Sequence, residues 1–440
     1  MTSTVRRLTY FIFAYTCIEG LIVNITYPNP LAFIVKDIVI AMLYLSLLTG
    51  QGTGSGTLGK LGGALGAFAF VMCFYMFMPT RVSLLSQAVG LKQKLFYIPL
   101  MYVAYAFVRD EQDLYRLIKL MAWTVIPTSV FGIYLYFAGP AALRALGAGY
   151  SSVVVSTAGA AGINFWRVPG TFTSPGQFSL YLLVNAALLS GLRMVPGAPK
   201  RQKMLSIVAL VVTLGALLVS GSRSPLVFYF LCTGLTLFYM GKLSRIGIAA
   251  LGAYTVMAVG FAYFGAGVQD RVGSIVSYDN VERFQTTYFG QMFIPHLLAS
   301  PMGLGLGVAT IGARHFTEWN NVVLVESYLS IIVYETGFIG LIVWLWATVR
   351  LVSVLVGCWR TMSTASWRAL WYTMVLLVFV LISVTPVNTV LDSAPGNMYF
   401  WFFIGAAVRL SDVNRLRAWQ QVSVSGPSPY GAVYGQGAAR

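Results

Sequence analysis

The chain has 440 residues, of which 58% are hydrophobic and only 10% are charged, and its mean hydropathy is +0.75. Soluble globular proteins average roughly 45 to 50% apolar and about 25% charged residues. The composition therefore excludes an ordinary soluble enzyme and predicts an all-α protein, a polytopic transmembrane helical bundle. In such a protein an active site must be built from helix ends and loops.

About twelve apolar blocks follow one another along the chain, most of them near the roughly 20 residues that cross a bilayer. We expect one integral membrane domain over residues 1–440, without the internal repeat that many transporters carry. No small-residue cleavage site follows the first block, so a retained helix is expected there and not a signal peptide. The blocks cover approximately residues 8–24, 31–49, 61–79, 95–108, 121–138, 176–192, 204–220, 225–240, 246–265, 323–349, 369–386 and 397–410.

The distribution of charge predicts the orientation. With a cytoplasmic N-terminus, most of the 29 Lys and Arg residues fall on the cytoplasmic side, as the positive-inside rule requires, and both termini are then cytoplasmic. Topology thus explains the net charge of +16 without nucleic acid, which we do not expect as a partner. Lys36 lies inside the second block beside Asp37, and we expect these two charges to neutralise each other locally. The outer side receives Arg81, Lys92, Lys94, Arg144, Arg167, Arg223, Arg271, Arg283 and Arg314.

Two long segments lie on the outer side, residues 139–175 and residues 266–322. Loops of this length usually carry function, and these contain little low-complexity sequence. The Gly-rich stretch 51–63 is interpreted as a cytoplasmic linker, and residues 411–440 as a cytoplasmic tail. The cysteines, Cys17, Cys73, Cys232 and Cys358, lie singly in apolar blocks without metal-ligand spacing, so we expect them to serve in packing.

The first candidate site is the turn at residues 221–225, Gly-Ser-Arg-Ser-Pro, which is too short to leave the membrane surface. It holds Arg223 at the level of the lipid headgroups. Two interpretations remain open at this point. The guanidinium group reaches a lipid phosphate, or it binds the diphosphate of a lipid-linked substrate, because a guanidinium fork matches phosphate oxygens bidentately.

The loop 266–322 contains further charges. Its basic residues Arg271, Arg283 and Arg314 are nearly balanced by acidic ones. Arg283 precedes the aromatic-rich run 284–289, which indicates either an amphipathic helix on the bilayer surface or a solvated helix with ion pairs. The segment 300–307, Ser-Pro-Met-Gly-Leu-Gly-Leu-Gly, lacks the Gly-Lys-Ser/Thr of a P-loop and the strand of a dinucleotide site.

Two glutamates open the long block that follows. If one helix contains both, their spacing puts Glu326 and Glu335 on opposite faces and about 13 Å apart along the axis, so they cannot form one carboxylate pair. Glu326 is expected near the outer helix start, where the helix dipole favours it and where it could also act as a base. Glu335, beside Gly337 and Gly340, is expected to order a tight helix contact or an internal hydrogen bond, with a catalytic role as the alternative.

The order of these pieces resembles the bacterial O-antigen ligase and polymerase superfamily. The resemblance covers about residues 160–345 and rests on short motifs in sequence order: 167–175 (Arg-Val-Pro-Gly-Thr-Phe-Thr-Ser-Pro), 221–223 (Gly-Ser-Arg), Arg283, 300–307, and Tyr328-Leu329 with Glu335, Gly337 and Gly340. It implies a multi-span glycosyltransferase of the inner (cytoplasmic) membrane that uses undecaprenyl diphosphate-linked sugars on the periplasmic face, without a divalent metal or other cofactor.

The resemblance also implies roles for single residues. Arg223 and Arg283 are similar to the family's diphosphate-binding arginines, and Arg167 resembles its frequent loop arginine. The ligases carry a His-Asn pair where this chain has Glu326-Ser327, and that histidine is proposed to activate the acceptor. The difference favours the polymerase and exopolysaccharide branch, with Glu326 as the base, because a late proton transfer to a carboxylate can suffice in a dissociative transfer. Supporting roles fall to Ser222, Tyr328, Glu335 and Arg271, and His296 and His315 are reserve candidates for the base.

The hypothesis is a direct inverting transfer of a polyprenyl-linked oligosaccharide to an acceptor glycan, in contact with membrane lipids. A chain-length regulator or other envelope assembly proteins would be further partners. An O-antigen ligase that transfers the glycan to lipid A-core is one alternative. A lipid-linked oligosaccharide flippase is another, and it predicts charged residues along a central cavity. A scaffold for envelope proteins is a third, and it predicts that the outer arginines are dispensable.

Overall fold

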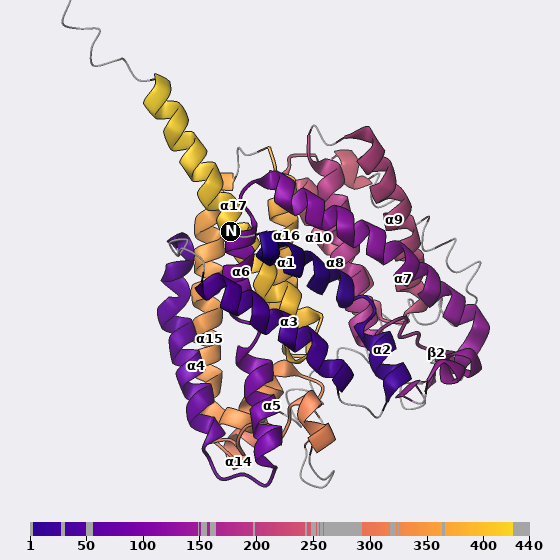
Figure 1. The fold of residues 1–440 in the computed structure, drawn as a ribbon, viewed down its shortest axis with the longest axis vertical. Coiled ribbons are helices and arrows are strands. Elements are labelled where there is room, and N and C mark those ends of the chain that lie inside the picture. Colours follow the sequence, from indigo (N-terminus) through magenta and orange to yellow (C-terminus); the bar gives the residue numbers. More distant parts are fainter. Residues whose placement is uncertain are drawn as a thin grey trace, which may run out of the picture.

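The computed structural model of the chain describes residues 3–27, 31–49, 56–147, 149–150, 156–158, 164–196, 199–242, 244–247, 293–316, 325–362 and 366–425, with the single residues 252, 255, 258 and 323. The described chain is almost entirely helical (Figure 1). Two short antiparallel strands, β1 (Ser156–Ala158) and β2 (Asn164–Trp166), are the exception within these ranges. The all-α prediction is confirmed for the part of the chain that is described.

The helices follow one another with short connections. Before the strands these are α1 (Ser3–Tyr15), α2 (Glu19–Thr26), α3 (Leu31–Leu48), η1 (Gly56–Leu61), α4 (Gly62–Met76), α5 (Leu84–Leu95), α6 (Leu100–Phe107) and α7 (Glu111–Leu146). After the strands come α8 (Pro175–Met194), α9 (Lys200–Val219), α10 (Arg223–Tyr239), α14 (Ile294–Ala299), η5 (Ile311–Phe316), α15 (Tyr328–Met362), α16 (Arg368–Ser383), η7 (Val390–Asp392) and α17 (Gly396–Ser425).

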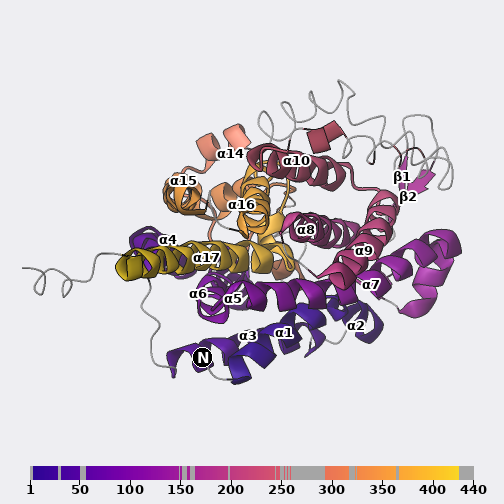
Figure 2. The same cartoon turned by 90° about the horizontal axis from the view of Figure 1, so that it is seen from above.

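The core lies between α8, α16 and the first half of α17. Figure 2 shows α8 and α16 enclosed by α10, α9, α7 and α15. Most residues of α8 and α16 are buried, which fits their sequences because a helix that is apolar all round must be covered on all sides. These two helices form the centre against which the elements that carry the candidate site residues pack.

Four described helices are long and apolar enough to cross a membrane: Gly56–Met76, Glu111–Leu146, Lys200–Val219 and Tyr328–Met362. A fifth span results if Thr4–Tyr15 and Glu19–Thr26, bent by 60° at their junction, count as one. Large apolar side chains also point outward: Phe70 and Phe74 of α4 are 73% and 58% exposed, and Phe77, which follows the helix, is 84% exposed. Such a surface is typical of contact with lipid, and it supports the prediction of a membrane protein.

Several predicted boundaries differ from the structure. The block 95–108 is divided between α5 and α6, because the chain turns at Pro99 before α6 begins. The predicted loop 139–175 begins inside α7, which continues past a break at Gly139 to Leu146. The predicted tail 411–440 begins inside α17, which extends to Ser425, and the predicted linker 51–63 already contains η1 and the start of α4. Helices thus run beyond the apolar blocks, since hydropathy marks burial in lipid and not the end of a helix.

Contacts between distant segments define two ends of the molecule. At one end Arg6 forms an ion pair with Asp113 at 2.9 Å, and Thr57 donates a hydrogen bond to Asp412 at 2.6 Å. At the other end lie α5, α14 and α2, opposite the N-terminus (Figure 1). We call this second end the α5–α14 end. The described residues that the sequence analysis assigned to the outer side lie there.

Candidate functional site

Two of the predicted arginines meet at the start of α10. Arg167 follows β2, and its Nη2 donates a hydrogen bond to Ser222 Oγ at 2.7 Å. Ser222 is the residue before α10, and Arg223 is the first residue of that helix. Gly221 has a φ of +67°, a value that suits glycine and lets the chain turn directly from α9 into α10. The predicted neighbourhood of Arg167, Ser222 and Arg223 is therefore present in the structure.

The surroundings of Arg167 and Arg223 favour the binding of an anion. The N-terminus of a helix carries a partial positive charge from its unpaired N–H groups, and α10 begins at Arg223. Ser222 makes no side-chain cap to these N–H groups; its hydroxyl accepts from Arg167 instead. Arg167 and Arg223 are both half-buried. Two guanidinium groups at a helix N-terminus form an arrangement that suits phosphate oxygens.

Glu326 lies just before α15 and is exposed. The helix begins at Tyr328, later than the predicted start, because Ser327 caps it: Ser330 N donates to Ser327 Oγ at 3.2 Å. Glu326 therefore points away from the packed core, unlike its neighbour Ser327, which is 1% exposed. Tyr328 is buried, and its ring packs edge-on against Trp344 with 5.3 Å between centroids.

The end of α16 connects these two groups. Leu329 N donates to Thr385 O at 3.1 Å, which fixes the start of α15 beside the residues that follow α16. On the other side, α10 and α16 pack together, and the hydroxyl oxygens of Thr236 and Thr373 are 3.4 Å apart. Thr236 lies near the end of α10, and Thr373 lies near the start of α16. The start of α10, with Arg223, therefore lies at the level of the residues that follow α16, such as Pro386. Arg223 and Glu326 thus belong to the same end of the bundle.

A buried ionic network lies behind Glu326, and the sequence did not predict it. Lys94 Nζ of α5 lies 3.1 Å from Glu335 Oε2 and 3.2 Å from Asp392 Oδ1. All three side chains are fully buried. Lys94 also donates to Thr310 Oγ1 at 3.2 Å, and its charge lies 5.6 Å from the centre of the Tyr328 ring. One lysine and two carboxylates thereby tie α5, α15 and η7 together.

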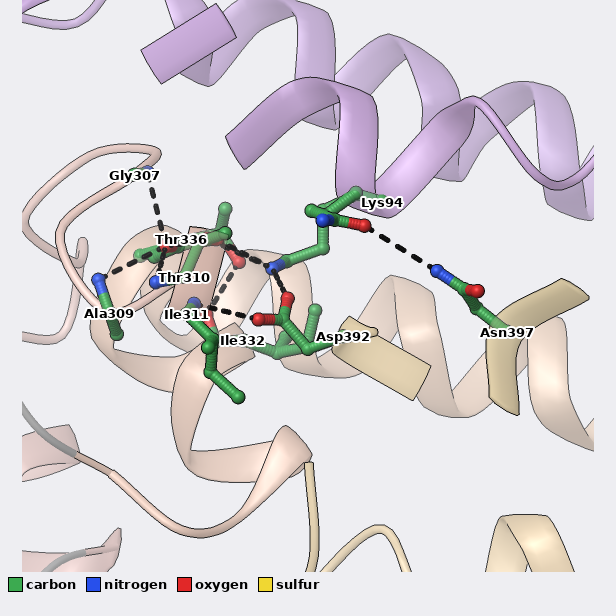
Figure 3. Close-up of polar contacts among 11 residues, drawn as sticks. Lys94, Gly307, Ala309, Thr310, Ile311, Ile332, Thr336, Asp392 and Asn397 are labelled. Atoms are coloured by element: carbon green, nitrogen blue, oxygen red, sulfur yellow. Dashed lines mark hydrogen bonds and ion pairs between the residues drawn. The ribbon is translucent and has the colours of Figure 1, made fainter. Parts of the chain in front are cut away.

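Glu335 is held by the loop that precedes η5. Its Oε1 accepts hydrogen bonds from the backbone N–H groups of Gly307, Ala309 and Thr310 at 3.0, 3.1 and 2.8 Å, and from Thr310 Oγ1 at 2.8 Å. Asp392 Oδ2 accepts from Ile311 N at 2.8 Å. Figure 3 shows these donors converging on the two carboxylates. The two carboxylates share the single cation of Lys94, and N–H and hydroxyl donors of the loop supply their remaining contacts, as buried carboxylates require.

The same loop fills a break in α15. Gly337 has a φ of +59° and interrupts the helix. The freed backbone groups find partners in residues 301–305: Leu304 N donates to Tyr334 O at 2.7 Å and Phe338 N to Pro301 O at 2.8 Å. A Cβ on Gly303 would lie 2.6 Å from Gly337 N. The Gly-x-Gly-x-Gly run is therefore a packing element that approaches the broken helix closely.

These contacts agree with the structural interpretation of Glu335, and its catalytic alternative stays a prediction. Glu335 orders an internal hydrogen-bond network and a close contact at Gly337, as the structural alternative predicted. Lys94 and Asp392 were missed. Lys94 was assigned to the outer side as an ordinary basic residue, although it directly precedes an apolar block; Asp392 lies between two apolar blocks. A charge beside an apolar block is costly in the membrane, so the positions of Lys94 and Asp392 were the signal that could have predicted the ionic network.

The expectation for Lys36 and Asp37 was wrong. Lys36 forms an ion pair with Glu19 at 2.7 Å, and Asp37 pairs with Lys92 of α5. Adjacent residues on α3 point to different sides, so each charge finds its partner on another helix. The two pairs join α3 to α2 and to α5.

Other predicted residues are described only in part or not at all. Arg271 and Arg283 lie outside the described residues, and so do the side chains of Arg314 and His315.

His296 of α14 stacks on Tyr334, with 3.5 Å between ring centroids and 11° between planes. Burial lowers the pKa of His296 below its usual value, which keeps its imidazole neutral at pH 7. Among the described residues no three His, Cys, Asp or Glu side chains gather as metal ligands would, so metal independence stays a prediction.

Comparison with known proteins adds no relative. No model of a known protein family matches the chain, and no curated protein sequence matches it. The functional assignment therefore depends on the geometry of Arg167, Ser222, Arg223 and Glu326 and on the resemblance of their motifs.

Proposed function

We propose that the chain is a membrane glycosyltransferase that polymerises undecaprenyl diphosphate-linked oligosaccharide repeat units on the periplasmic face of the bacterial inner membrane. It would cross the membrane about twelve times with both termini in the cytoplasm, and residues 266–322 would form its large periplasmic loop. The observation that carries the proposal is the contact of Arg167 with Ser222 at 2.7 Å. It sets two guanidinium groups at the start of α10, as the binding of a diphosphate needs.

In the proposed reaction the acceptor hydroxyl oxygen attacks the anomeric carbon of the donor sugar. The bond between that carbon and the diphosphate oxygen breaks, and its electron pair leaves with the polyprenyl diphosphate. Arg167, Arg223 and Arg283 hold the diphosphate and stabilise the charge that develops on it. Glu326 accepts the proton of the hydroxyl as the new bond forms. Positioning and charge stabilisation supply most of the rate enhancement.

The buried network supports this assignment by fixing the site's frame. Lys94, Glu335 and Asp392 join three elements at the α5–α14 end, and Glu335 lies in the same helix as the residues that follow Glu326. A rigid frame holds catalytic groups in place, which loops alone do less well.

The buried charges also bear on the transporter alternative. A flippase would need charged groups that line a path, and Lys94 and Asp392 add to the interior charges that the sequence predicted, Glu335 among them. In the structure these groups are tied to one another and to backbone N–H groups. A closed network of this kind favours a structural role, so we retain the transferase.

The proposal is tested by incubating the purified full-length protein with a synthetic polyprenyl diphosphate oligosaccharide. A ladder of products is the expected result. A single addition to a different acceptor would identify a ligase, and the absence of any product together with movement of the lipid across a vesicle membrane would identify a flippase.

The same assay tests metal independence. We expect full activity in EDTA, because arginines and not a divalent ion neutralise the diphosphate in this proposal. Loss of activity in EDTA with recovery on addition of manganese would contradict it.

A further inference from the structure

A second charged feature lies at the opposite end of the molecule, between η1, α15 and α17. A hollow of about 170 Å³ is present there. Three cations line it, Lys60 from η1, Arg350 from α15 and Arg415 from α17, with the hydroxyls of Thr57 and Ser353 beside them. The three basic side chains are exposed. Residues far apart in the sequence thus contribute positive charge to one space.

In the part of the chain that the structure describes, the three cations form no ion pair with an acidic side chain. Among the ion pairs of the described residues, none involves Lys60, Arg350 or Arg415. Arg350 Nη2 donates to the carbonyl oxygen of Lys60 at 3.5 Å, a contact that neutralises no charge. The basic side chains of the hollow therefore leave their charge available to an anion from outside the chain.

The carboxylate of Asp412, which contacts the lining residue Thr57, is engaged by neutral donors. Asp412 accepts hydrogen bonds from Thr57 N at 3.2 Å and Thr57 Oγ1 at 2.6 Å. Tyr105 donates a third from its hydroxyl at 2.8 Å. These contacts fix η1 against α17 and hold Lys60 at the hollow. Asp412 thus positions Thr57 at the hollow and forms no ion pair with its three cations.

The hollow borders an apolar surface. Arg350 and Ser353 of α15 lie between Val349 and Val356 along the helix, and these two valines are 60% and 54% exposed. Trp346, one turn before Arg350, is 46% exposed. A ligand that matches both surfaces has an anionic head and apolar chains, which distinguishes a lipid from a free phosphate ion.

We propose that this hollow binds the phosphate-bearing headgroup of an anionic membrane lipid, whose acyl chains lie along the exposed apolar face of α15. Basic pockets between transmembrane helices on the cytoplasmic side bind such headgroups. The positions of Lys60, Arg350 and Arg415 on the side predicted to be cytoplasmic agree with this ligand. The inference concerns the end of the molecule remote from Arg223 and does not depend on the transferase reaction.

The test is native mass spectrometry of the purified full-length protein with defined lipids. We expect the protein to retain phosphatidylglycerol or cardiolipin and to lose phosphatidylcholine. Replacing all three cations, Lys60→Gln with Arg350→Gln and Arg415→Gln, should weaken anionic-lipid binding by about 100-fold, since each cation near anionic headgroups strengthens binding by about fivefold. Inorganic phosphate alone, the second probe, should not displace the lipid.

Matched variants separate charge at this hollow from charge in general. Lys200→Gln with Arg201→Gln and Arg245→Gln removes the same charge from the start of α9 and from the segment that follows α10, and it should leave lipid retention unchanged. Lys60→Arg with Arg350→Lys and Arg415→Lys keeps the charge and should retain the lipid, which also shows that the fold survives changes at these positions. Equal retention of phosphatidylcholine, equal loss in the control variant, or occupation by phosphate in place of lipid would overturn the proposal.

Discussion

At the scale of single residues, the account gives Glu326 the role of proton acceptor. The residue is exposed at the α5–α14 end while its neighbour Ser327 is buried as a helix cap. Glu326→Gln keeps the size of the side chain but removes the charge that accepts a proton. We expect kcat to fall by about 100-fold or more, with KM nearly unchanged, because general-base catalysis contributes on that scale.

The matched control for this variant is Glu111→Gln. Glu111 is paired with Arg417 at 2.9 Å at the opposite end of the molecule, so its loss should leave kcat near the wild-type value. Wild-type turnover by Glu326→Gln would remove the proposed base. In that event His296→Phe, which preserves the stacking on Tyr334, would show whether the neutral imidazole has the role instead.

At the scale of elements, the buried network should dominate local stability. Lys94 and Lys92 lie two positions apart on α5, and each forms an ion pair, but Lys94 is fully buried whereas the side chain of Lys92 is 34% exposed. Lys94→Met leaves two buried carboxylates without their cation, which should cost about 3–5 kcal/mol. Lys92→Met should cost about 1 kcal/mol or less.

Thermal unfolding of the detergent-purified variants, followed by tryptophan fluorescence, measures this difference. A similar loss of stability in both variants would contradict the view that burial makes the Lys94 network strong. Because the comparison uses two lysines of one helix, a general effect of removing positive charge from α5 cancels.

The break in α15 makes a separate prediction. A Cβ on Gly337 would lie 2.1 Å from Pro301 O, and the residue has a φ of +59°. Gly337→Ala should therefore destabilise the protein by more than about 2 kcal/mol. Gly66 of α4 has nothing within 4 Å of its Cβ position, so Gly66→Ala should be neutral or stabilising by up to about 1 kcal/mol. Equal unfolding temperatures for the two variants would show that the loop does not depend on this close approach.

The sequence predicted the membrane bundle and the turn before α10, because local patterns encode them, but it did not predict the contacts between distant residues. Apolar blocks predict a membrane bundle because burial in lipid requires them, and the short turn at Gly221 predicts where Arg223 lies. The contact of Lys94 with Asp392 joins residues that are 298 positions apart. No local pattern encodes such a pairing, and the broken helix at Gly337 has partners that only the folded loop supplies.

At the scale of the whole molecule, the account requires that the two ends face opposite sides of the membrane. Arg81, between α4 and α5, belongs to the α5–α14 end, and Arg360 lies near the end of α15, next to the Thr361 carbonyl that accepts from Asn414 at 2.7 Å. Both side chains are exposed. In a Cys73→Ala background, Arg81→Cys should react with a membrane-impermeant maleimide in intact cells, and Arg360→Cys only after lysis. The opposite pattern would contradict the orientation.

In the proposed mechanism, guanidinium groups at the start of α10 hold the diphosphate of a lipid carrier. The most direct test of this mechanism is the Kd of the purified full-length protein for polyprenyl diphosphate, compared between the wild type and Arg167→Lys with Arg223→Lys. Lysine keeps the charge but cannot form the bidentate fork, so we expect binding to weaken at least about tenfold. The control, Arg81→Lys with Arg144→Lys, should bind like the wild type. An unchanged Kd in the Arg167 and Arg223 variant would contradict the account.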